Sequence, residues 1–508
     1  MIIIIFDYII KIWKIKTMRK IREILILTFI VTLSNFFLTY SQEKRKTESL
    51  SGEQSLVLES FIVGDGANNY LGSAVSAEGD FNGDGVNDLV IGANGAGRNR
   101  EGRIYVFYGK KFPKNLFASN ADLIINGEKN GDSFGWSVSF ESDVNKDGFT
   151  DLLVGAISTN EEFEKTGTVY LFYGKNITGE ISASKADKKF VGIRKEQFFG
   201  WSISSGSDIN GDGNIDIVVG AVGNSKYKDG IMAGGVYAFF GNKFEDTTKA
   251  DEADIVISGE KYSSHMGNSV SIKGDVNGDG VDDLLAGAFF CDLDGYRGGR
   301  AYLFYGKKNF KKDIDASDAD LIIRADGRDE WIGNKVRIIP DINGDKLSDF
   351  MVSAPGKDTE HQDSGVAYVF YGGDRKGKIR ASEADLILKG KPVGRKFGSY
   401  ISSLGDIDGD GRVDLAISEP GGEANPREML NLGSVYFFLS TLLKEKEKAI
   451  DGFAISGPKP DTEFGNSISL NDVDGDGIKE VIISSYYENI NGDKSGAVFI
   501  YKWLIKRR

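Results

Sequence analysis

One acidic motif recurs seven times along this 508-residue chain, and its spacing constrains the fold more than any other feature. In the fourth copy it reads DVNGDGVDDLLAGA, residues 275–288. Successive copies lie 63 to 67 residues apart, and a constant period of this size is the signature of a repeat architecture. The copies begin at Asp80, Asp143, Asp208, Asp275, Asp341, Asp406 and Asp472.

Each period contains four short apolar segments that are rich in Val, Ile, Tyr and Phe and are separated by Gly, Asp and Asn. One such set is ADLIING (121–127), WSVSF (136–140), DLLVGA (151–156) and TVYLFYG (168–174). Segments of this length and composition are typical of β-strands, and none shows sustained helical periodicity. Four strands repeated seven times predict an all-β fold, a seven-bladed β-propeller with four-stranded blades. A linear solenoid is the alternative.

The two ends of the repeat region are complementary. Residues 56–63 (LVLESFIV) form an apolar strand with no blade before it, and the last period ends at 497–503 (AVFIYKW) without a fourth strand. Pairing these two segments would complete the seventh blade and remove an exposed sheet edge. We therefore expect a closed propeller over residues 56–503, a linker at 42–55 and a basic C-terminal tail at 504–508.

The acidic loops place oxygen-bearing residues at offsets 1, 3, 5, 7 and 9, with the main-chain carbonyl acting at offset 7. Carboxylates at alternating positions of a tight loop converge and repel one another unless a hard cation lies between them. Oxygen ligands without His or Cys favour calcium over zinc or copper. The bland alternative, a solvated acidic turn, does not explain seven copies. The sequence predicts up to seven structural calcium ions.

The predicted metal ligands form seven sets of five residues. They are Asp80, Asn82, Asp84, Val86 and Asp88; Asp143, Asn145, Asp147, Phe149 and Asp151; Asp208, Asn210, Asp212, Asn214 and Asp216; Asp275, Asn277, Asp279, Val281 and Asp283; Asp341, Asn343, Asp345, Leu347 and Asp349; Asp406, Asp408, Asp410, Arg412 and Asp414; and Asp472, Asp474, Asp476, Ile478 and Glu480.

The net charge agrees with metal loops. The chain carries 62 Lys and Arg against 75 Asp and Glu, a formal charge of −13, which excludes a generic basic surface for nucleic acid. Much of the acidity lies in the loops. The single cysteine, Cys291, cannot form an internal disulfide. The two histidines, His265 and His361, are too few for a histidine-based metal site.

The first 41 residues differ from the rest. Lysines and arginines between residues 11 and 22 precede an apolar run from Ile24 to about Tyr40. This order is typical of a secretory signal peptide, with translation starting at Met1 or Met18. An uncleaved N-terminal anchor is the alternative, because the run approaches the length of a membrane span. Either interpretation exports the remaining chain to the extracellular space, the cell surface or the periplasm.

The period resembles the FG-GAP repeat of integrin alpha subunits and related surface proteins. Phe134-Gly135, Phe199-Gly200, Phe397-Gly398 and Phe464-Gly465 carry the Phe-Gly half, and Ser353-Ala354-Pro355 is the best match to the Gly-Ala-Pro half. The resemblance covers about residues 56–503 and implies the integrin-type propeller. Here all seven periods carry the acidic loop. Loop 5 departs at offset 6, where Lys346 replaces glycine, and we expect it to be the weakest site.

The resemblance implies a secreted or surface-exposed, calcium-binding adhesion or protein-interaction module rather than an enzyme. Variable segments between the second and third strands, and between blades, emerge opposite the acidic loops, where a ligand site is expected. Tyr227, Phe289, Phe290 and Tyr296 are candidate contacts. The expected partner is an extracellular protein or glycan, with membrane contact only through an uncleaved leader. The alternatives are a glycan-binding lectin and a calcium-dependent polysaccharide-active enzyme.

Overall fold

The computed structural model describes most of the chain beyond its first 48 residues. The chain divides into two units, residues 1–57 and residues 58–508. The leader 1–41, most of the linker 42–55, and residues 506–508 of the tail lie outside the described residues. Within those residues no helix is both long and apolar enough to span a membrane. The described ranges are 49–50, 54–160, 164–223, 232–241, 244–260, 263–359, 362–390, 396–421, 432–443, 446–449 and 453–505.

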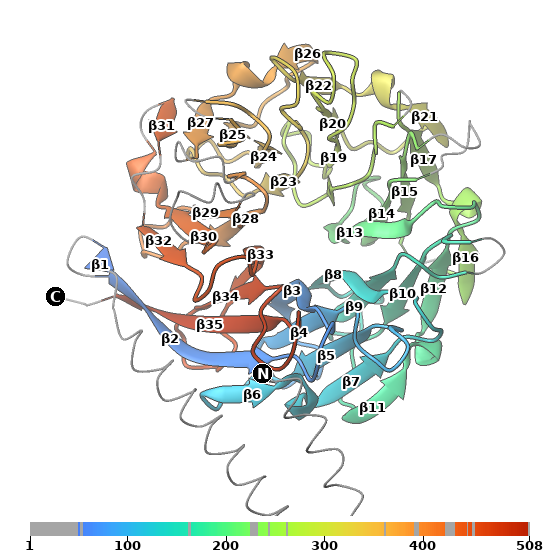
Figure 1. Ribbon diagram of the computed structural model, residues 1–508. Helices are drawn as coiled ribbons and strands as arrows, with labels where there is room; N and C mark the ends of the chain where they lie inside the picture. The colour runs from blue at the N-terminus through green and yellow to red at the C-terminus, as the bar shows by residue number, and fades with distance from the viewer. Residues whose placement is uncertain are drawn as a thin grey trace, which may run out of the picture. The chain divides into compact units, whose positions relative to one another are not determined.

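Seven sheets, antiparallel in their four main strands, surround a central axis, as Figure 1 shows. The strand order confirms the predicted seven-bladed β-propeller, with one strand of each blade nearest the axis. These inner strands are β3 (Leu71–Gly79), β8 (Phe134–Ser142), β13 (Phe199–Ser207), β18 (Val270–Ser271), β23 (Val336–Ile339), β28 (Ile401–Gly405) and β33 (Phe464–Asn471). The second strands are β4 (Asp88–Ala93), β9 (Asp151–Ala156), β14 (Asp216–Ala221), β19 (Leu284–Ala288), β24 (Asp349–Ala354), β29 (Asp414–Glu419) and β34 (Glu480–Ser485).

The third and fourth strands continue each blade outward. The third strands are β5 (Arg103–Phe107), β10 (Thr168–Phe172), β15 (Gly235–Phe239), β20 (Arg300–Phe304), β25 (Val366–Phe370), β30 (Ser434–Phe438) and β35 (Ala497–Ile505). The fourth strands of blades 1 to 6 are β7 (Leu123–Asn126), β12 (Lys188–Val191), β17 (Ile255–Ser258), β22 (Leu321–Arg324), β27 (Leu386–Lys389) and β32 (Phe453–Ser456).

Most blades gain a fifth, short strand that pairs in parallel with the fourth and comes from the following repeat. This strand was not predicted from the sequence, because its three or four residues include polar ones and show no apolar pattern. A single 3-10 turn that begins at a buried alanine follows most of these strands, as at η1 (Ala118–Asn120). The fifth strands are β6 (Asn115–Phe117), β11 (Gly179–Ser182), β16 (Thr247–Lys249), β21 (Asp313–Asp315), β26 (Gly377–Arg380) and β31 (Glu447–Ala449).

The ring closes in blade 7 by pairing the two ends of the repeat region. Strand β2 (Gln54–Val63) lies beside β35, so that the blade reads β2-β35-β34-β33. Figure 1 shows this as a blue strand against a red one. A parallel bridge between Leu71 and Gly496 joins blade 7 to blade 1. The predicted closure is therefore confirmed, because β2 supplies the outer strand that the last repeat lacks.

The core lies between neighbouring blades and explains the Phe-Gly motif. Phe134 is fully buried, and its ring meets Tyr170 of the same blade edge-on at 5.4 Å between centroids. The same cluster includes Ile104 and Val106 of blade 1. The blades approach so closely that a Cβ on Gly102, at φ +84°, would lie 2.1 Å from the Phe134 carbonyl oxygen. Only glycine fits there.

Candidate metal loops and the axial channel

Each acidic loop connects the inner strand of a blade to the second strand and folds around its own carboxylates. In loop 4 the Asp275 carboxylate accepts hydrogen bonds from the N–H groups of Gly278 (2.6 Å) and Gly280 (2.7 Å). Asp279 accepts one from Val281 N–H (3.0 Å). Loops 1 and 3 repeat these bonds. The main chain thus wraps around a group of side-chain oxygens, as a cation-binding turn requires.

The carboxylate at offset 9 has a further structural role. Asp283 is fully buried, and its two oxygens accept the N–H of Val276 (2.7 Å) and of Gly306 (2.8 Å), which follows the third strand. The same pair of bonds recurs in the other loops through loop 6. Burial raises the pKa of Asp283 to about 7. Offset 9 therefore fastens the loop to the blade.

Offset 3 divides the loops into two groups. In loops 1 to 5 it is asparagine, and the amide of Asn277 donates to Asp279 at 2.9 Å. In loops 6 and 7 it is aspartate, and three carboxylates converge within 4.8 Å in each: Asp406, Asp408 and Asp414, and Asp472, Asp474 and Asp476. Burial and the neighbouring Asp410 raise the pKa of Asp408. Oxygen donors of this kind are the ligands that a hard divalent cation prefers, but in loop 7 the Lys502 ammonium already lies 2.8 Å from Asp474.

Two lysines occupy turn positions that are glycine in most loops. Lys346 at offset 6 of loop 5 has φ +75°, and Lys146 at offset 4 of loop 2 has φ +61°. The sequence analysis identified Lys346 and missed Lys146. The ammonium of Lys146 bonds to the Gly213 carbonyl (2.7 Å) and to Asn214 (3.0 Å) in loop 3. Lys146 therefore gains contacts that offset part of its backbone strain.

Neighbouring loops are linked by main-chain hydrogen bonds. The N–H of Thr150 donates to the Asp80 carbonyl (2.9 Å), joining loops 1 and 2. The N–H of Ser348 donates to the Asp275 carbonyl (3.0 Å), joining loops 4 and 5. Asp282 makes the same bond to loop 3 at 3.3 Å. Much of the loop face is therefore one connected surface.

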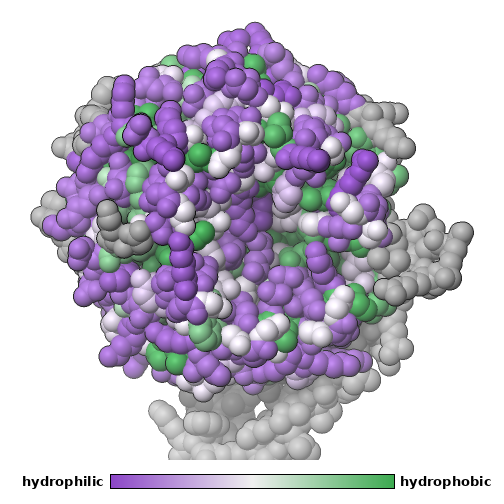
Figure 2. Space-filling model, turned by 180° about the vertical axis from the view of Figure 1, so that it is seen from behind, coloured by the Kyte–Doolittle hydropathy of each residue, from purple (hydrophilic) through white to green (hydrophobic). Residues whose placement is uncertain are grey.

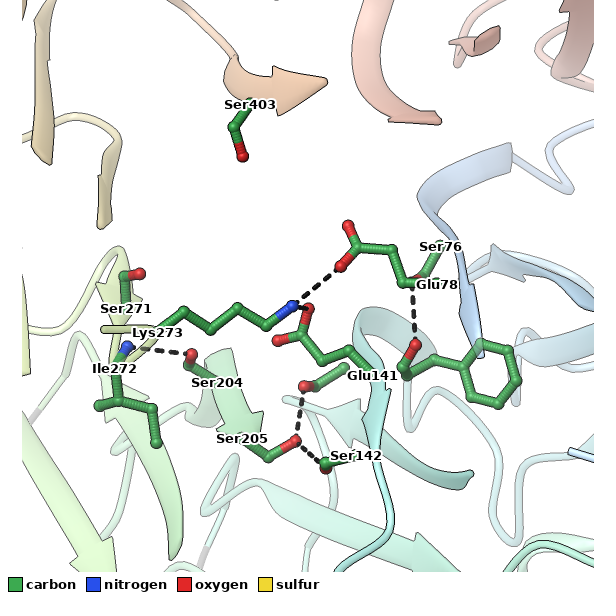
Figure 3. Close-up of polar contacts among 12 residues, drawn as sticks. Ser76, Glu78, Glu141, Ser142, Ser204, Ser205, Ser271, Ile272, Lys273 and Ser403 are labelled. Atoms are coloured by element: carbon green, nitrogen blue, oxygen red, sulfur yellow. Dashed lines mark hydrogen bonds and ion pairs between the residues drawn. The ribbon is translucent and has the colours of Figure 1, made fainter. Parts of the chain in front are cut away.

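Serine hydroxyls line the axial channel and connect inner strands that do not pair as a sheet. Ser271 accepts the N–H of Ile338 in the next blade (3.0 Å), and Ser469 accepts that of Ala77 across the closure (3.0 Å). Ser204 accepts the N–H of Ile272 at 3.3 Å, which Figure 3 shows. Buried N–H groups that would otherwise lack partners are satisfied in this way.

Four charged side chains from four blades meet near the loop end of the channel, and Figure 3 labels three of them, Glu78, Glu141 and Lys273. The Lys273 ammonium pairs with Glu78 (2.9 Å) and with Glu141, and Arg337 pairs with Glu78 (3.4 Å). Burial would raise the pKa of Glu78, but Lys273 and Arg337 outweigh it and hold that pKa at about 2. Burial raises the pKa of Glu141. The two acidic and two basic side chains therefore form an ion-pair network across the channel axis.

The channel contains a cavity of about 400 Å³. Aromatic side chains line the end of this cavity that lies away from the charged cluster. Trp136 and Trp201 lie at the starts of neighbouring inner strands with ring centroids 4.7 Å apart. The Lys335 ammonium lies 5.9 Å from the Tyr400 ring. Because inner strands begin at the face opposite the acidic loops, these residues form the channel mouth on that face. Figure 2 shows one face of the molecule, hollowed at its centre and lined with hydrophilic residues.

The contacts proposed from the sequence lie beside this mouth rather than in it. Phe289 and Phe290 pack against His265, with centroids 5.7 and 5.1 Å away. Tyr296 is 51% exposed, and the Arg297 guanidinium lies 5.0 Å from its ring. Tyr227 lies outside the described residues. The channel residues were not singled out from the sequence, although Trp136 and Trp201 both follow a Phe-Gly pair directly.

The FG-GAP repeat matches this chain in four places, at residues 71–107, 134–172, 199–231 and 399–438. Integrin alpha-11 of Homo sapiens is 33% identical over 187 residues, which are 35% of this chain and 15% of that protein. Phosphatidylinositol-glycan-specific phospholipase D of Bos taurus is 26% identical over 397 residues, 72% of this chain and 45% of the enzyme.

Integrin alpha-PS5 of Drosophila melanogaster is 37% identical over 160 residues, 30% of this chain and 15% of that protein. The chain thus spans less than half the length of each of these relatives. They include both integrin subunits and an enzyme. Each matched FG-GAP segment begins on an inner strand or just before one, and each spans the acidic loop. The chain is a seven-bladed β-propeller with FG-GAP repeats in four places and with homologues among integrin alpha subunits.

Proposed function

We propose that this propeller is a calcium-stabilised adhesion or protein-interaction module that works outside the cytoplasm and binds a protein ligand at the channel mouth. One observation carries the proposal: the face opposite the acidic loops presents Trp136, Trp201, Tyr400 and Lys335 around a single cavity. Tryptophan and tyrosine side chains are enriched among the residues that dominate binding energy at protein interfaces. The similarity to integrin alpha subunits supports the same interpretation.

The acidic loops would hold calcium on the opposite face. The carboxylates at offsets 1 and 5, the side chain at offset 3 and the carbonyl at offset 7 supply oxygen ligands. A bound divalent ion would neutralise carboxylates that otherwise repel one another. Extracellular calcium modules bind at about 10⁻⁴–10⁻³ M, so that this role suits an exported protein. Calcium there stabilises the hairpin that joins two strands of each blade and takes no part in a reaction.

The charged cluster in the channel supports binding rather than catalysis. Glu78, Glu141, Lys273 and Arg337 are paired with one another. Asp294, a carboxylate outside the acidic loops, pairs with Arg300 at 2.5 Å. We therefore propose a module that recognises a ligand and leaves it chemically unchanged.

A binding experiment with mouth variants tests the proposal. Labelled full-length protein is applied to an array of extracellular-matrix proteins and to a glycan array, beside the Trp136→Ala/Tyr400→Ala variant. We expect protein spots to be bound by the wild type and lost by the variant at an unchanged melting temperature. Leu442→Ala serves as the control, because Leu442 is 56% exposed and lies away from the channel. Binding confined to glycans, or kept by the variant, would contradict the proposal.

A further inference from the structure

A lysine reaches into the seventh acidic loop. Lys502 lies opposite Glu480 in the ladder between β34 and β35. Its ammonium is 2.8 Å from Asp474, 2.5 Å from Asp476 and 3.2 Å from Glu480. These three carboxylates are the predicted ligands at offsets 3, 5 and 9. The Lys502 side chain is only 12% exposed, so the ammonium lies inside the loop and not above it.

The other blades have no such lysine. In the aligned third-strand segments, RIYVFY of blade 1 corresponds to AVFIYK of blade 7, so that Lys502 stands where blades 1, 2, 4 and 5 have tyrosine and blade 6 has Leu439. Among the described residues, no Lys or Arg forms an ion pair with a carboxylate at offset 1, 3 or 5 of loops 1 to 6. Loop 6 is the natural comparison, because it too has aspartate at offset 3.

An ammonium and a calcium ion would compete for the same oxygens. Two cations separated by the width of one carboxylate repel strongly in a partly buried site. An ammonium held on a strand beside the carboxylates binds them within the same molecule, so it has a high effective concentration at the site. The three carboxylates lie within 3.2 Å of the Lys502 ammonium and balance its charge.

We propose that the Lys502 ammonium takes the place of calcium in loop 7, so that this blade is held by a cation that belongs to the chain. The inference rests on the proposed calcium loops in the other blades. Blade 7 is also the closure of the ring, where β2 and β35 pair. Glu59 of β2 lies 3.8 Å from the same ammonium. Blade 7, where the ring closes, would thus keep the cation of its loop when calcium is withdrawn.

Counting bound calcium tests the inference. Full-length wild type and Lys502→Met are compared by equilibrium dialysis against radioactive calcium at saturating concentration. We expect Lys502→Met to bind one more ion per molecule than the wild type, because the change removes the charge and keeps the side-chain stem. Lys479→Met is the matched control: it deletes the same charge at offset 8 of the same loop, and we expect no gain. An unchanged count in Lys502→Met overturns the inference.

Aspartate variants distinguish a failure of this inference from a failure of the proposed function. They also provide a test that does not depend on the folding of Lys502→Met. Offset 1 is aspartate in all seven loops, and in loop 7 it is not among the carboxylates that pair with Lys502. Asp472→Ala in loop 7 should leave the wild-type count unchanged, whereas Asp406→Ala in loop 6 should lower it by one. A loss of one ion in Asp472→Ala would show that loop 7 binds calcium despite Lys502 and would overturn the inference. A count unchanged in Asp406→Ala would instead contradict the proposed calcium loops.

Discussion

Serine hydroxyls in the channel replace hydrogen bonds that a continuous sheet would provide. Inner strands of adjacent blades belong to different sheets and are not paired with each other, so their facing N–H groups need another acceptor. Ser271 and Ser469 each supply an acceptor for a buried N–H of a neighbouring blade. Such a bond is valuable mainly because its loss leaves a buried donor unsatisfied. The recurring Ser-X-Ser pattern of the inner strands is thus a structural requirement of ring closure.

Removing one of these hydroxyls should destabilise the folded protein. We expect Ser271→Ala to lower the free energy of unfolding by about 1–3 kcal/mol, because the N–H of Ile338 loses its acceptor. Urea denaturation followed by tryptophan fluorescence measures the change. Ser403→Ala is the control: Ser403 is partly exposed, and its hydroxyl has no hydrogen bond to a described residue. A change within about 0.5 kcal/mol is expected there, and equal effects of both variants would refute the role given to Ser271.

The positive φ angle of Lys346 leads to the opposite kind of prediction. Replacing Lys346 by glycine should stabilise the protein by about 1 kcal/mol, because a non-glycine residue in the left-handed region costs about that much. Lys146→Gly should gain less, since it also loses the two bonds to loop 3. Urea midpoints of the two variants, measured side by side, test the difference. A larger gain for Lys146→Gly would mean that its ammonium contacts contribute nothing.

At the scale of the element, the blade depends on a buried aromatic pair. The phenylalanine of the Phe-Gly motif begins the inner strand and packs edge-on against the central tyrosine of the third strand, at 5.4 Å in blade 2 and 5.5 Å in blade 3. The glycine after it, as at Gly135 with φ +88°, turns the chain into the inner strand. The motif therefore couples a turn to a core contact.

Truncating this phenylalanine should be among the most damaging single changes. Phe134→Ala is expected to cost about 3–5 kcal/mol, the range for large-to-small changes at fully buried positions. Phe117→Ala provides the control, because Phe117 is 37% exposed in the short strand β6. Melting temperatures by circular dichroism compare the two. A smaller loss for Phe134→Ala than for Phe117→Ala would contradict the packing role of the motif.

Strand order and blade number followed from the sequence because they depend on local pattern. Apolar runs, glycine pairs and acidic loops recur within each period, and the period alone sets the count. What was missed depends on contacts between repeats. The fifth strand β16 (TTK) has no apolar pattern, and the Lys273–Glu78 pair joins residues 195 apart. Yet Lys273 and Glu78 each stand two residues before their acidic loop, so aligned repeats place them on one level of the channel.

At the scale of the whole molecule, the loops act together. Main-chain bonds link neighbouring loops, and each proposed ion fixes a hairpin at the end of two core strands. With calcium at about four to five times its dissociation constant, each ion contributes about 1 kcal/mol, and six ions together contribute about 6 kcal/mol. That sum is comparable with the net stability of an ordinary domain. Calcium supply would then decide how much of the ring stays folded.

Chelation should therefore lower the melting temperature. With an unfolding entropy of about 2.1 cal/mol/K per residue, a loss of about 6 kcal/mol corresponds to roughly 6 °C for the propeller. Calorimetry in calcium and in EDTA measures the shift, and re-added calcium should reverse it. Magnesium at equal concentration is the control, because its small octahedral shell suits these loops poorly. An EDTA scan that overlays the calcium scan would refute structural calcium.

Chelation should also act unevenly around the ring. Where calcium clasps the hairpin, its removal frees the loop, and amides of the adjoining second strand should exchange with solvent faster. In loop 7 the cation is the Lys502 ammonium, which EDTA does not remove. Hydrogen exchange followed by mass spectrometry should therefore show faster exchange in β29 of blade 6 after EDTA, with β34 of blade 7 unchanged. In Lys502→Met both strands should respond to EDTA. Faster exchange of β34 in the wild type would place calcium at the closure itself and leave the ring without a metal-independent blade.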